Sequence, residues 1–330
     1  MSQLTRRAVL AGAAATTALS PLATAPSAQA AAPLAGKQTA GWYRYKVGDI
    51  EITVVTDGVN RFPLNDAFVT NVKKDEVNAA LAAAYMEKDK LAIPYSPIVV
   101  NTGSKLVAID TGTGEANFER SKGAAGQYHS NLKAAGIDRN AVDIALISHF
   151  HGDHINGLLT PDNKPAFPNA EILVPAAEWK YFMDDAEMGR QTTERMKGVF
   201  SNARRVFDAL GRKATPYEPN KEIAPGITSV PTLGHTPGHS SHIVASGSSK
   251  VYVQADVTNV PFLFARNPGW HLMFDQDANM AEATRRKVYD MLAAEKMLVQ
   301  GFHYPFPSLA YIEKSGTGYR EIPVPWSPTI

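Results

Sequence analysis

The sequence contains no cysteine in its 330 residues. Disulfide bonds, thiolate metal ligands and a cysteine nucleophile are therefore excluded, and any metal must be held by imidazole and carboxylate groups. Zinc, iron, cobalt and manganese all accept such ligands. A net charge of one sign is also lacking, because 33 basic residues stand against 32 acidic ones, so no general field attracts nucleic acid. Beyond residue 30, no apolar run approaches the ~18 to 20 residues of a membrane span.

The first thirty residues have the three-part layout of an export signal. The dipeptide Arg6-Arg7 precedes an Ala/Leu-rich stretch, and the segment closes on Ala28-Gln29-Ala30. The run TRRAVL resembles the twin-arginine type of signal. We therefore expect cleavage after residue 30 and a periplasmic or secreted protein. An N-terminal extension over 31–41 and one large domain over 42–330 would follow. A disordered or helical Ala-rich tail is the alternative interpretation.

Downstream patterns predict strands in runs that helices interrupt. Residues 42–58 alternate in two short runs around Gly48, which indicates a β-hairpin. Helical spacing covers VKKDEVNAALAAAY and most of residues 176–210, and a further helix follows Asp277, its expected N-cap. The strands do not alternate strictly with helices. This pattern favours sheet layers with helices outside them.

A cluster of metal-binding side chains occupies the segment SHFHGDHINGLL. His149, His151, Asp153 and His154 follow the apolar run VDIALI directly and include three of the nine histidines in the chain. Histidines two positions apart in an extended segment project to one side, so both rings can bind one ion. The glycine after them permits a turn that would let Asp153 and His154 face a second ion. Both ions would need further ligands downstream.

Further candidate ligands lie at the ends of later strand-like runs. They are His235 in TLGHTPGHSSH, Asp256 in VQADVTN and His303 in VQGFHYPFP. Together with Asp110-Thr111-Gly112 and the histidine cluster, these ordered motifs resemble those of the metallo-β-lactamase fold superfamily. The resemblance covers roughly residues 42 to 324. The spacing and the tail GTGYREIPVPW are most similar to the branch of methyl parathion hydrolase and lactonase-type enzymes.

The resemblance implies an α+β fold, an αββα sandwich in which two mixed sheets pack face to face with helices outside. It also implies two divalent metal ions, zinc first and otherwise iron, cobalt or manganese. Three histidines would bind the first ion: His149, His151 and His235. A mixed set would bind the second ion: Asp153, His154 and His303. Asp256 would bridge both ions together with a hydroxide, which makes Asp153 and Asp256 the expected catalytic carboxylates. Asp110 and His239 would orient the ligands without binding metal.

A substrate pocket with an apolar wall is expected beside the ions. Four aromatic residues near the motifs are the candidates for this wall: Trp179, Phe182, Phe262 and Phe264. One departure from the family concerns Asn259, three residues after the bridging aspartate. Many quorum-quenching lactonases have a tyrosine there that can contact the substrate carbonyl. The sequence therefore does not single out homoserine lactones as substrates.

These features predict a dinuclear hydrolase that uses a bridging hydroxide to cleave lactones or aryl esters, with organophosphate triesters as a further substrate class. A small molecule with an apolar part is the expected partner, without nucleic acid or membrane, and a homodimer is left open. Alternatives also stay open. A glyoxalase II-like thioesterase or a mononuclear iron persulfide dioxygenase would use a similar histidine cluster. A non-catalytic periplasmic metal-binding module would show no turnover for a chelator to abolish.

Overall fold

The computed structural model describes residues 34–36, 38, 39 and 41–330, so the predicted export signal lies outside the described residues. The described residues of the 31–41 extension form no regular structure. Contacts divide the chain between Thr39 and Ala40, and the chain from Ala40 onward forms a single unit. Within the described part of the chain, no helix combines the length and hydropathy needed to cross a bilayer.

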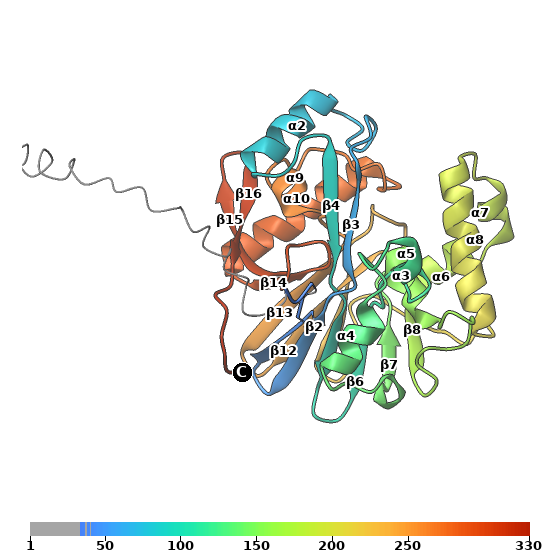
Figure 1. Ribbon diagram of the computed structural model, residues 1–330. Helices are drawn as coiled ribbons and strands as arrows, with labels where there is room; N and C mark the ends of the chain where they lie inside the picture. Colours follow the sequence, from blue (N-terminus) through green and yellow to red (C-terminus); the bar gives the residue numbers. More distant parts are fainter. Residues whose placement is uncertain (1–33, 37, 40) are drawn as a thin grey trace, which may run out of the picture. The chain divides into compact units, whose positions relative to one another are not determined.

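The first of two large sheets has the spatial order β1-β2-β5-β6-β7-β8-β9, of which Figure 1 labels β2, β6, β7 and β8. Its strands are β1 (Trp42–Val47), β2 (Ile50–Val55), β5 (Ile98–Asn101), β6 (Leu106–Ile109), β7 (Ile144–Leu146), β8 (Glu171–Pro175) and β9 (Thr215–Tyr217). β1 and β2 form the predicted hairpin, with Val47 opposite Ile50. The strands from β6 to β9 pair in parallel, so the sheet is mixed.

The second sheet follows chain order from β10 to β16. Its strands are β10 (Glu222–Ala224), β11 (Ile227–Pro231), β12 (Ser240–Ser246), β13 (Ser249–Ala255), β14 (Leu298–Gly301), β15 (Leu309–Ser315) and β16 (Gly318–Pro323). Only the β13–β14 pair is parallel. β15 and β16 form the hairpin that closes the chain.

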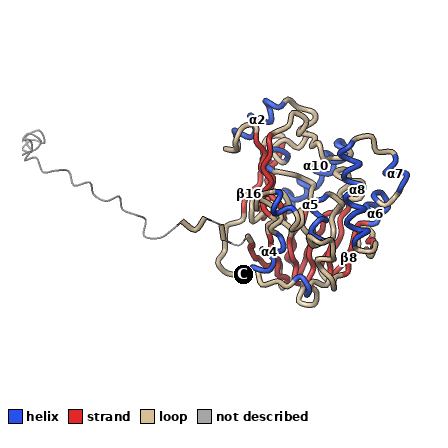
Figure 2. Tube along the Cα trace, turned by 45° about the vertical axis from the view of Figure 1, so that its right-hand side comes forward, coloured by secondary structure: helices blue, strands red, loops and turns tan. Residues whose placement is uncertain are grey.

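Helices flank the strands, and Figure 2 shows α6, α7 and α8 gathered on one side of them. The α-helices are α2 (Lys74–Ala83), α3 (Asn117–Arg120), α4 (Tyr128–Ala134), α5 (Gly152–Ile155), α6 (Ala176–Phe182), α7 (Asp185–Gly189), α8 (Glu194–Ala209), α9 (Pro261–Phe264) and α10 (Ala278–Glu295). Two 3-10 turns are η1 (Arg139–Ala141) and η2 (Asn156–Leu158). The predicted cap of α10 is confirmed, because the Asp277 carboxylate accepts a hydrogen bond from the backbone N–H of Met280.

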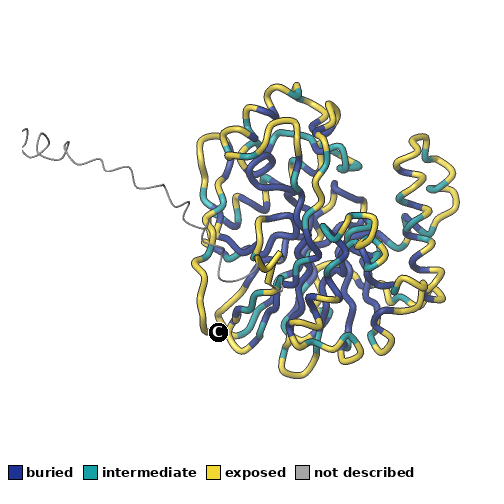
Figure 3. The backbone as a smooth tube through the Cα atoms, in the orientation of Figure 1, coloured by how far each residue is buried: buried dark blue, intermediate teal, exposed yellow. Residues whose placement is uncertain are grey.

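Alternation along the strands distributes the apolar side chains over both faces of each sheet. On β2, Val54 belongs to the cluster between the two sheets, whereas Val55 packs with residues of α4 and α8. α10 covers the outer face of the second sheet through Val288 and Leu292. Buried positions accordingly follow the strands (Figure 3). The predicted αββα sandwich with two mixed sheets is confirmed.

A separate two-stranded sheet, which the sequence patterns did not predict, joins β3 (Gly58–Pro63) to β4 (Lys90–Tyr95). Proline at position 94 interrupts the strand-like pattern, and proline is normally confined to strand edges. The two partners are also separated along the chain by α2. Their pairing places Asn60 directly opposite Ile93, with Phe62 and Tyr95 two positions further along the same face. This two-stranded sheet forms one wall of the cavity beside the metal centre.

Candidate metal centre

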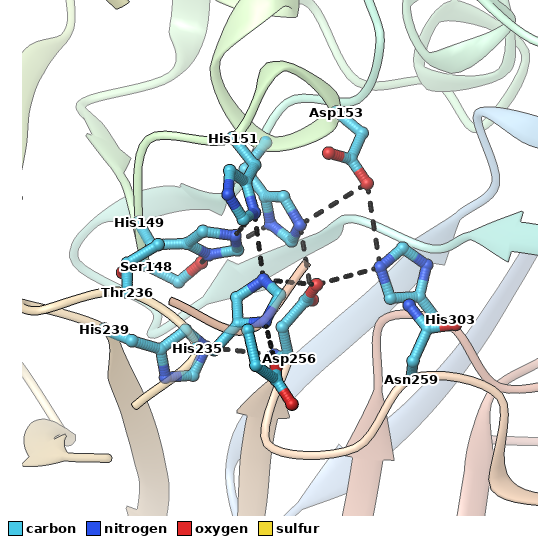
Figure 4. A network of polar contacts seen from close by, with 12 residues as sticks. Ser148, His149, His151, Asp153, His235, Thr236, His239, Asp256, Asn259 and His303 are labelled. Atoms are coloured by element: carbon cyan, nitrogen blue, oxygen red, sulfur yellow. Dashed lines mark hydrogen bonds and ion pairs between the residues drawn. The ribbon is translucent and has the colours of Figure 1, made fainter. Parts of the chain in front are cut away.

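The first candidate ligands follow the end of β7. Their side chains project to one side of the chain, as the spacing of two positions predicted. Phe150 is fully buried in the cluster between the first sheet and its helices. Its neighbours His149 and His151 project to the other side, where their rings lie 4.8 Å apart between centroids (Figure 4). The chain then turns directly into α5, whose first residues include Asp153 and His154. One short segment therefore supplies four candidate ligands.

The remaining ligands come from the second sheet and its loops. Asp256 follows β13, where the register with β14 shifts between Val253 and Ala255. Ala255 itself has a left-handed backbone, with a φ of 50°. Such an irregularity beside a site re-aims the next side chain, here the Asp256 carboxylate. His303 lies two residues past the end of β14.

Three imidazole nitrogens of the first predicted set point at one another. His149 Nε2 lies 3.1 Å from His151 Nδ1, and His151 Nδ1 lies 2.9 Å from His235 Nε2. All three side chains are buried. These atoms form one of the groups whose ligand atoms lie within 4.8 Å of one another, which is the spacing that a shared ion requires.

The second predicted set forms another such group, made by Asp153, His154 and His303. Asp153 Oδ2 lies 3.6 Å from the Nε2 atoms of both histidines. Asp256 stands between the two groups: its Oδ2 is 3.3 Å from His235 Nε2 and 3.0 Å from His303 Nε2. Its Oδ1 is 3.3 Å from His154 Nε2. The structure thus brings all seven predicted ligands together, and a third group of potential ligand atoms, from His149, His154 and Asp256, joins the two sets.

Unpartnered buried atoms show that these residues fit cations. His154 Nε2 and Asp256 Oδ1 are buried without any hydrogen-bond partner, and they face each other across the second group. Leaving such polar atoms buried and unpaired is unfavourable. A divalent ion at this position would satisfy both atoms. The donor set of imidazole and carboxylate is one that zinc accepts.

The titration behaviour of the cluster leads to the same conclusion. Burial, and next the charge of His154, holds the pKa of His149 well below its usual value, so this ring keeps a free lone pair. Burial acts in the same direction on His154, yet the carboxylates of Asp256 and Asp110 raise the pKa of that ring well above its usual value. The centre therefore favours positive charge beside Asp256, which a bound cation would supply in place of protons.

Asp110 and His239 occupy the orienting positions that the resemblance implied. Asp110 Oδ2 accepts a hydrogen bond from His154 Nδ1 at 2.8 Å, which leaves Nε2 to face the centre. The same carboxylate accepts from the backbone N–H and the hydroxyl of Ser148. His239 Nε2 accepts from the backbone N–H of Asp256 at 3.0 Å. Neither residue belongs to a group of potential metal ligands among the described residues.

One orienting residue, Asp275, was missed by the sequence reasoning. Its Oδ1 accepts a hydrogen bond from His235 Nδ1 at 2.8 Å, and its Oδ2 lies 3.3 Å from a guanidinium nitrogen of Arg285. Arg285 is itself buried, and it donates to the backbone carbonyl of Trp270. Asp275 stands 40 residues from His235 in the sequence and belongs to no motif. No local signal could have identified it.

A second missed residue is Glu178 on α6, which is fully buried. Its Oε1 accepts from the backbone N–H of Phe150, while its Oε2 accepts from the Thr236 hydroxyl and the backbone N–H of Gly238. Burial raises the pKa of this carboxyl to about 7, although the three hydrogen bonds act to lower it. A Cβ on Gly238 would lie 2.2 Å from the Glu178 backbone nitrogen, so only glycine permits this approach. Glu178 therefore ties the His149–His151 loop to the loop of His235.

The centre opens into a cavity of about 370 Å³. Asp153, Asp256 and His303 are among the residues that line it. Its apolar side consists of residues from the β3–β4 sheet and from α8 and a loop: Phe62, Ile93, Tyr95, Val199 and Phe274. The polar part includes Asn259, Arg120 and Arg195. A cavity of this size, with an apolar side and a polar side, suits a small molecule that has both kinds of surface.

The four aromatic residues expected in the pocket do not line this cavity, which is a correction to the sequence prediction. Trp179 packs against Phe207 with ring centroids 5.2 Å apart, on the helix side of the first sheet. Phe182 and Phe264 are fully buried in hydrophobic clusters. Phe262 lines a different cavity, on the opposite face of the β3–β4 sheet. Aromatic residues that are close to the ligands in sequence can belong to the hydrophobic core, so sequence distance alone did not identify the residues that line the cavity.

Three further histidines lie outside the groups of potential metal ligands. His129 Nε2 is 2.8 Å from the Gly157 carbonyl oxygen, and His271 Nε2 is 3.0 Å from Glu282. His242 Nε2 is 3.1 Å from the Tyr217 hydroxyl. Each ring thus has a local hydrogen-bond partner.

Comparison with known proteins connects this arrangement to a family. The model of the "Metallo-beta-lactamase superfamily" matches residues 93–293, which run from β4 to α10. This chain belongs to the metallo-beta-lactamase superfamily. The matched segment contains six of the seven ligands, and His303 follows shortly after it.

Individual members of the superfamily are similar at low sequence identity. An N-acyl homoserine lactonase from Bacillus sp is 27% identical over 171 residues, which cover 51% of this chain and 58% of that enzyme. The solved structure of hydrolase AbOPH is 26% identical, with a TM-score of 0.80, and the match covers 88% of this chain and 100% of that one. AidC, a dizinc quorum-quenching lactonase, has the same TM-score at 24% identity, with coverage of 87% and 98%.

Proposed function

We propose that this protein is a metal-dependent hydrolase that cleaves carboxylic esters and lactones of small molecules at two divalent cations, with zinc as the native metal. The observation that carries the proposal is the position of Asp256 between a three-histidine group and a mixed group, at the base of a cavity of about 370 Å³. The similarity to an N-acyl homoserine lactonase supports lactones within this class.

Two bound cations would supply a hydroxide nucleophile near neutral pH and polarise the scissile carbonyl. In the net reaction, the oxygen of water joins the acyl carbon, the ester C–O bond breaks, and a proton passes to the leaving oxygen. Asp153 has a partly exposed carboxylate that lines the cavity, with Oδ2 directed at His154 and His303. Oδ1 is then the atom placed to carry this proton toward the leaving oxygen.

Organophosphate triesters form the second candidate substrate class. Phe62 and Phe274 offer ring surfaces on the cavity wall that suit an aryl leaving group. A phosphoryl oxygen would take the place of the carbonyl oxygen at the same centre, and water would again supply the entering oxygen.

Metal analysis combined with a substrate panel tests this function. We expect two zinc ions per chain, turnover of lactones and aryl esters, loss of turnover after chelation, and recovery after zinc is restored. Phosphotriesters in the same panel test the second class. A single iron per chain with persulfide oxidation would support the dioxygenase instead. A fully loaded protein that hydrolyses no member of the panel would contradict the proposal.

We further propose that the protein is exported through its twin-arginine-type segment and acts in the periplasm or outside the cell. The support is the order of Arg6-Arg7, the Ala/Leu-rich stretch and Ala28-Gln29-Ala30. N-terminal sequencing of protein from its native host should find a start near Ala31. An intact Met1 or Ser2 would contradict export with cleavage.

A further inference from the structure

Two exposed arginines, Arg120 and Arg195, line the cavity beside the metal centre. The charge of Asp275 acts on Arg195, but the Asp275 carboxylate is itself engaged by His235 and Arg285. Arg120 is the last residue of α3, and Arg195 lies in the first turn of α8. The acidic residues that line the same cavity are Asp153 and Asp256, both candidate metal ligands. Neither arginine forms an ion pair among the described residues. The ion pairs that involve an arginine there are all made by other arginines. Two cationic groups thus remain for a ligand.

The fold holds both arginines at this cavity. Asp57 is fully buried, and it accepts hydrogen bonds from the backbone N–H groups of Thr113 and Tyr128, the two sides of the loop that contains α3. Arg195 lies over the ring of Phe274, with its guanidinium carbon 6.0 Å from the ring centroid. Asp57 thus holds the backbone of the loop that carries Arg120, and Phe274 contacts the guanidinium of Arg195.

An unpaired guanidinium at the edge of a cavity is suited to an anionic oxygen group. Its planar fork binds carboxylates through paired, charge-assisted hydrogen bonds. The metal ligands occupy the base of this cavity, and the apolar residues Phe62, Ile93 and Val199 line its wall. A ligand that matches all three parts has an ester carbonyl, an apolar body and a carboxylate away from the ester.

We propose that this cavity selects anionic esters, in which a carboxylate remote from the scissile bond binds Arg120 and Arg195 while the apolar body lies on the wall. This inference rests on the proposed ester hydrolysis and specifies its substrate class. A neutral ester would reach the same metal centre but would leave both guanidinium groups without a partner. Selectivity should therefore appear in kcat/KM.

Two matched chromogenic esters test the selectivity in the zinc-loaded enzyme: 4-nitrophenyl hydrogen glutarate, which carries a remote carboxylate, and neutral 4-nitrophenyl pentanoate. Arg120→Gln and Arg195→Gln should each lower the ratio of kcat/KM for the anionic ester to that for the neutral ester by about 10-fold. Raising the ionic strength should reduce the ratio in the wild type. Lys122→Gln and Lys197→Gln are the controls, because these exposed lysines lie two residues from each arginine and do not line the cavity. They should leave the ratio unchanged.

Binding provides a second measurement that needs no turnover. Glutarate and pentanoate each offer one carboxylate to the metal ions, but only glutarate has another for the arginines. Calorimetric titration of the zinc-loaded protein should show about 10-fold tighter binding of glutarate, and the double variant Arg120→Gln/Arg195→Gln should lose this preference. Equal binding of both ligands to the wild type, or an unchanged ester ratio in the double variant, would overturn the inference. Absence of turnover with either ester, combined with a preference for glutarate, would instead refute the hydrolase function alone.

Discussion

Asp256 contacts both halves of the metal centre, and its Oδ2 alone meets a histidine from each half. Oδ1 faces His154, and Oδ2 faces His235 and His303. A carboxylate between two cations offsets their mutual repulsion, so Asp256→Ala should release at least one ion. His239 only holds the Asp256 backbone, and His239→Ala should lower metal affinity by about 10- to 100-fold without removing either site. Elemental analysis of both variants checks this, and wild-type metal content in Asp256→Ala would contradict it.

Tyr95 is the tyrosine that lines the cavity beside the metal centre. Its ring lies 5.6 Å from that of His303 between centroids, and the residue lines the cavity together with Asn259. Burial, and next the charge of Asp153, raises the pKa of Tyr95 above its usual value, so the hydroxyl keeps its proton and can donate to a substrate oxygen. Tyr95→Phe should therefore lower kcat by about 10- to 100-fold while KM changes little.

Steady-state kinetics of zinc-loaded Tyr95→Phe, with metal content measured on the same sample, separates this role from a loss of metal. Tyr43→Phe is the matched control, because Tyr43 lies on β1 and does not line the cavity. Wild-type kcat in Tyr95→Phe would show that the phenol only packs against the site.

At the scale of elements, Glu178 connects α6 to the two loops that carry the first three histidines. Its carboxylate satisfies three donors that lie 28 to 60 residues away in the sequence. Glu178→Gln replaces one acceptor oxygen with an NH₂ donor, which leaves at least one buried donor unpaired. We expect a loss of about 1 to 3 kcal/mol in the free energy of unfolding of the metal-free protein and weaker zinc binding.

Denaturant titrations of metal-free protein and zinc competition with a chromogenic chelator measure the two effects of Glu178→Gln. Glu171→Gln is the control, because Glu171 is exposed at the start of β8. If zinc affinity stayed at the wild-type value while stability fell, Glu178 would support the fold without positioning the ligands.

Local patterns were enough to predict the ligand segments but not the residues that hold them. His149, His151 and His154 form one short motif, and the strand before it is a continuous apolar run. Asp275 and Glu178 are lone acidic residues whose partners come from distant segments, so only the packed structure reveals their contacts. The same limit explains the unpredicted β3–β4 sheet, in which the paired strands flank α2.

At the scale of the whole domain, the centre lies where strand ends from both sheets meet. β7 delivers the first histidines, whereas β13 and β14 deliver Asp256 and His303. The relative position of the two sheets therefore determines the spacing of the ligands. The cluster between the sheets includes Val54 and Leu146 on one side and Val253 on the other, and it fixes this position by apolar packing.

A buried hydrogen bond also joins the two sheets, and it should make their association sensitive to acid. The His242 ring on β12 meets the Tyr217 hydroxyl on β9 at 3.1 Å. Burial lowers the pKa of His242 from 6.5 to about 4. Because the unfolded chain takes up the proton at higher pH, this contribution to stability is complete above pH ~6.5 and is lost as the pH falls toward ~4. The loss between pH 7.5 and 4.5 should be roughly 2 to 3 kcal/mol.

His242→Gln retains a polar partner for Tyr217 but cannot titrate, so its free energy of unfolding should fall less than that of the wild type over this pH interval. Urea titrations of both proteins at pH 7.5 and 4.5 measure the difference. The metal ligands are the same in both proteins, so their acid sensitivity cancels in the comparison. His271→Gln should behave like the wild type, because His271 is only partly buried and pairs with Glu282 at the surface of α10. An identical loss of stability in His242→Gln and the wild type would mean that acid weakens the sandwich through other groups.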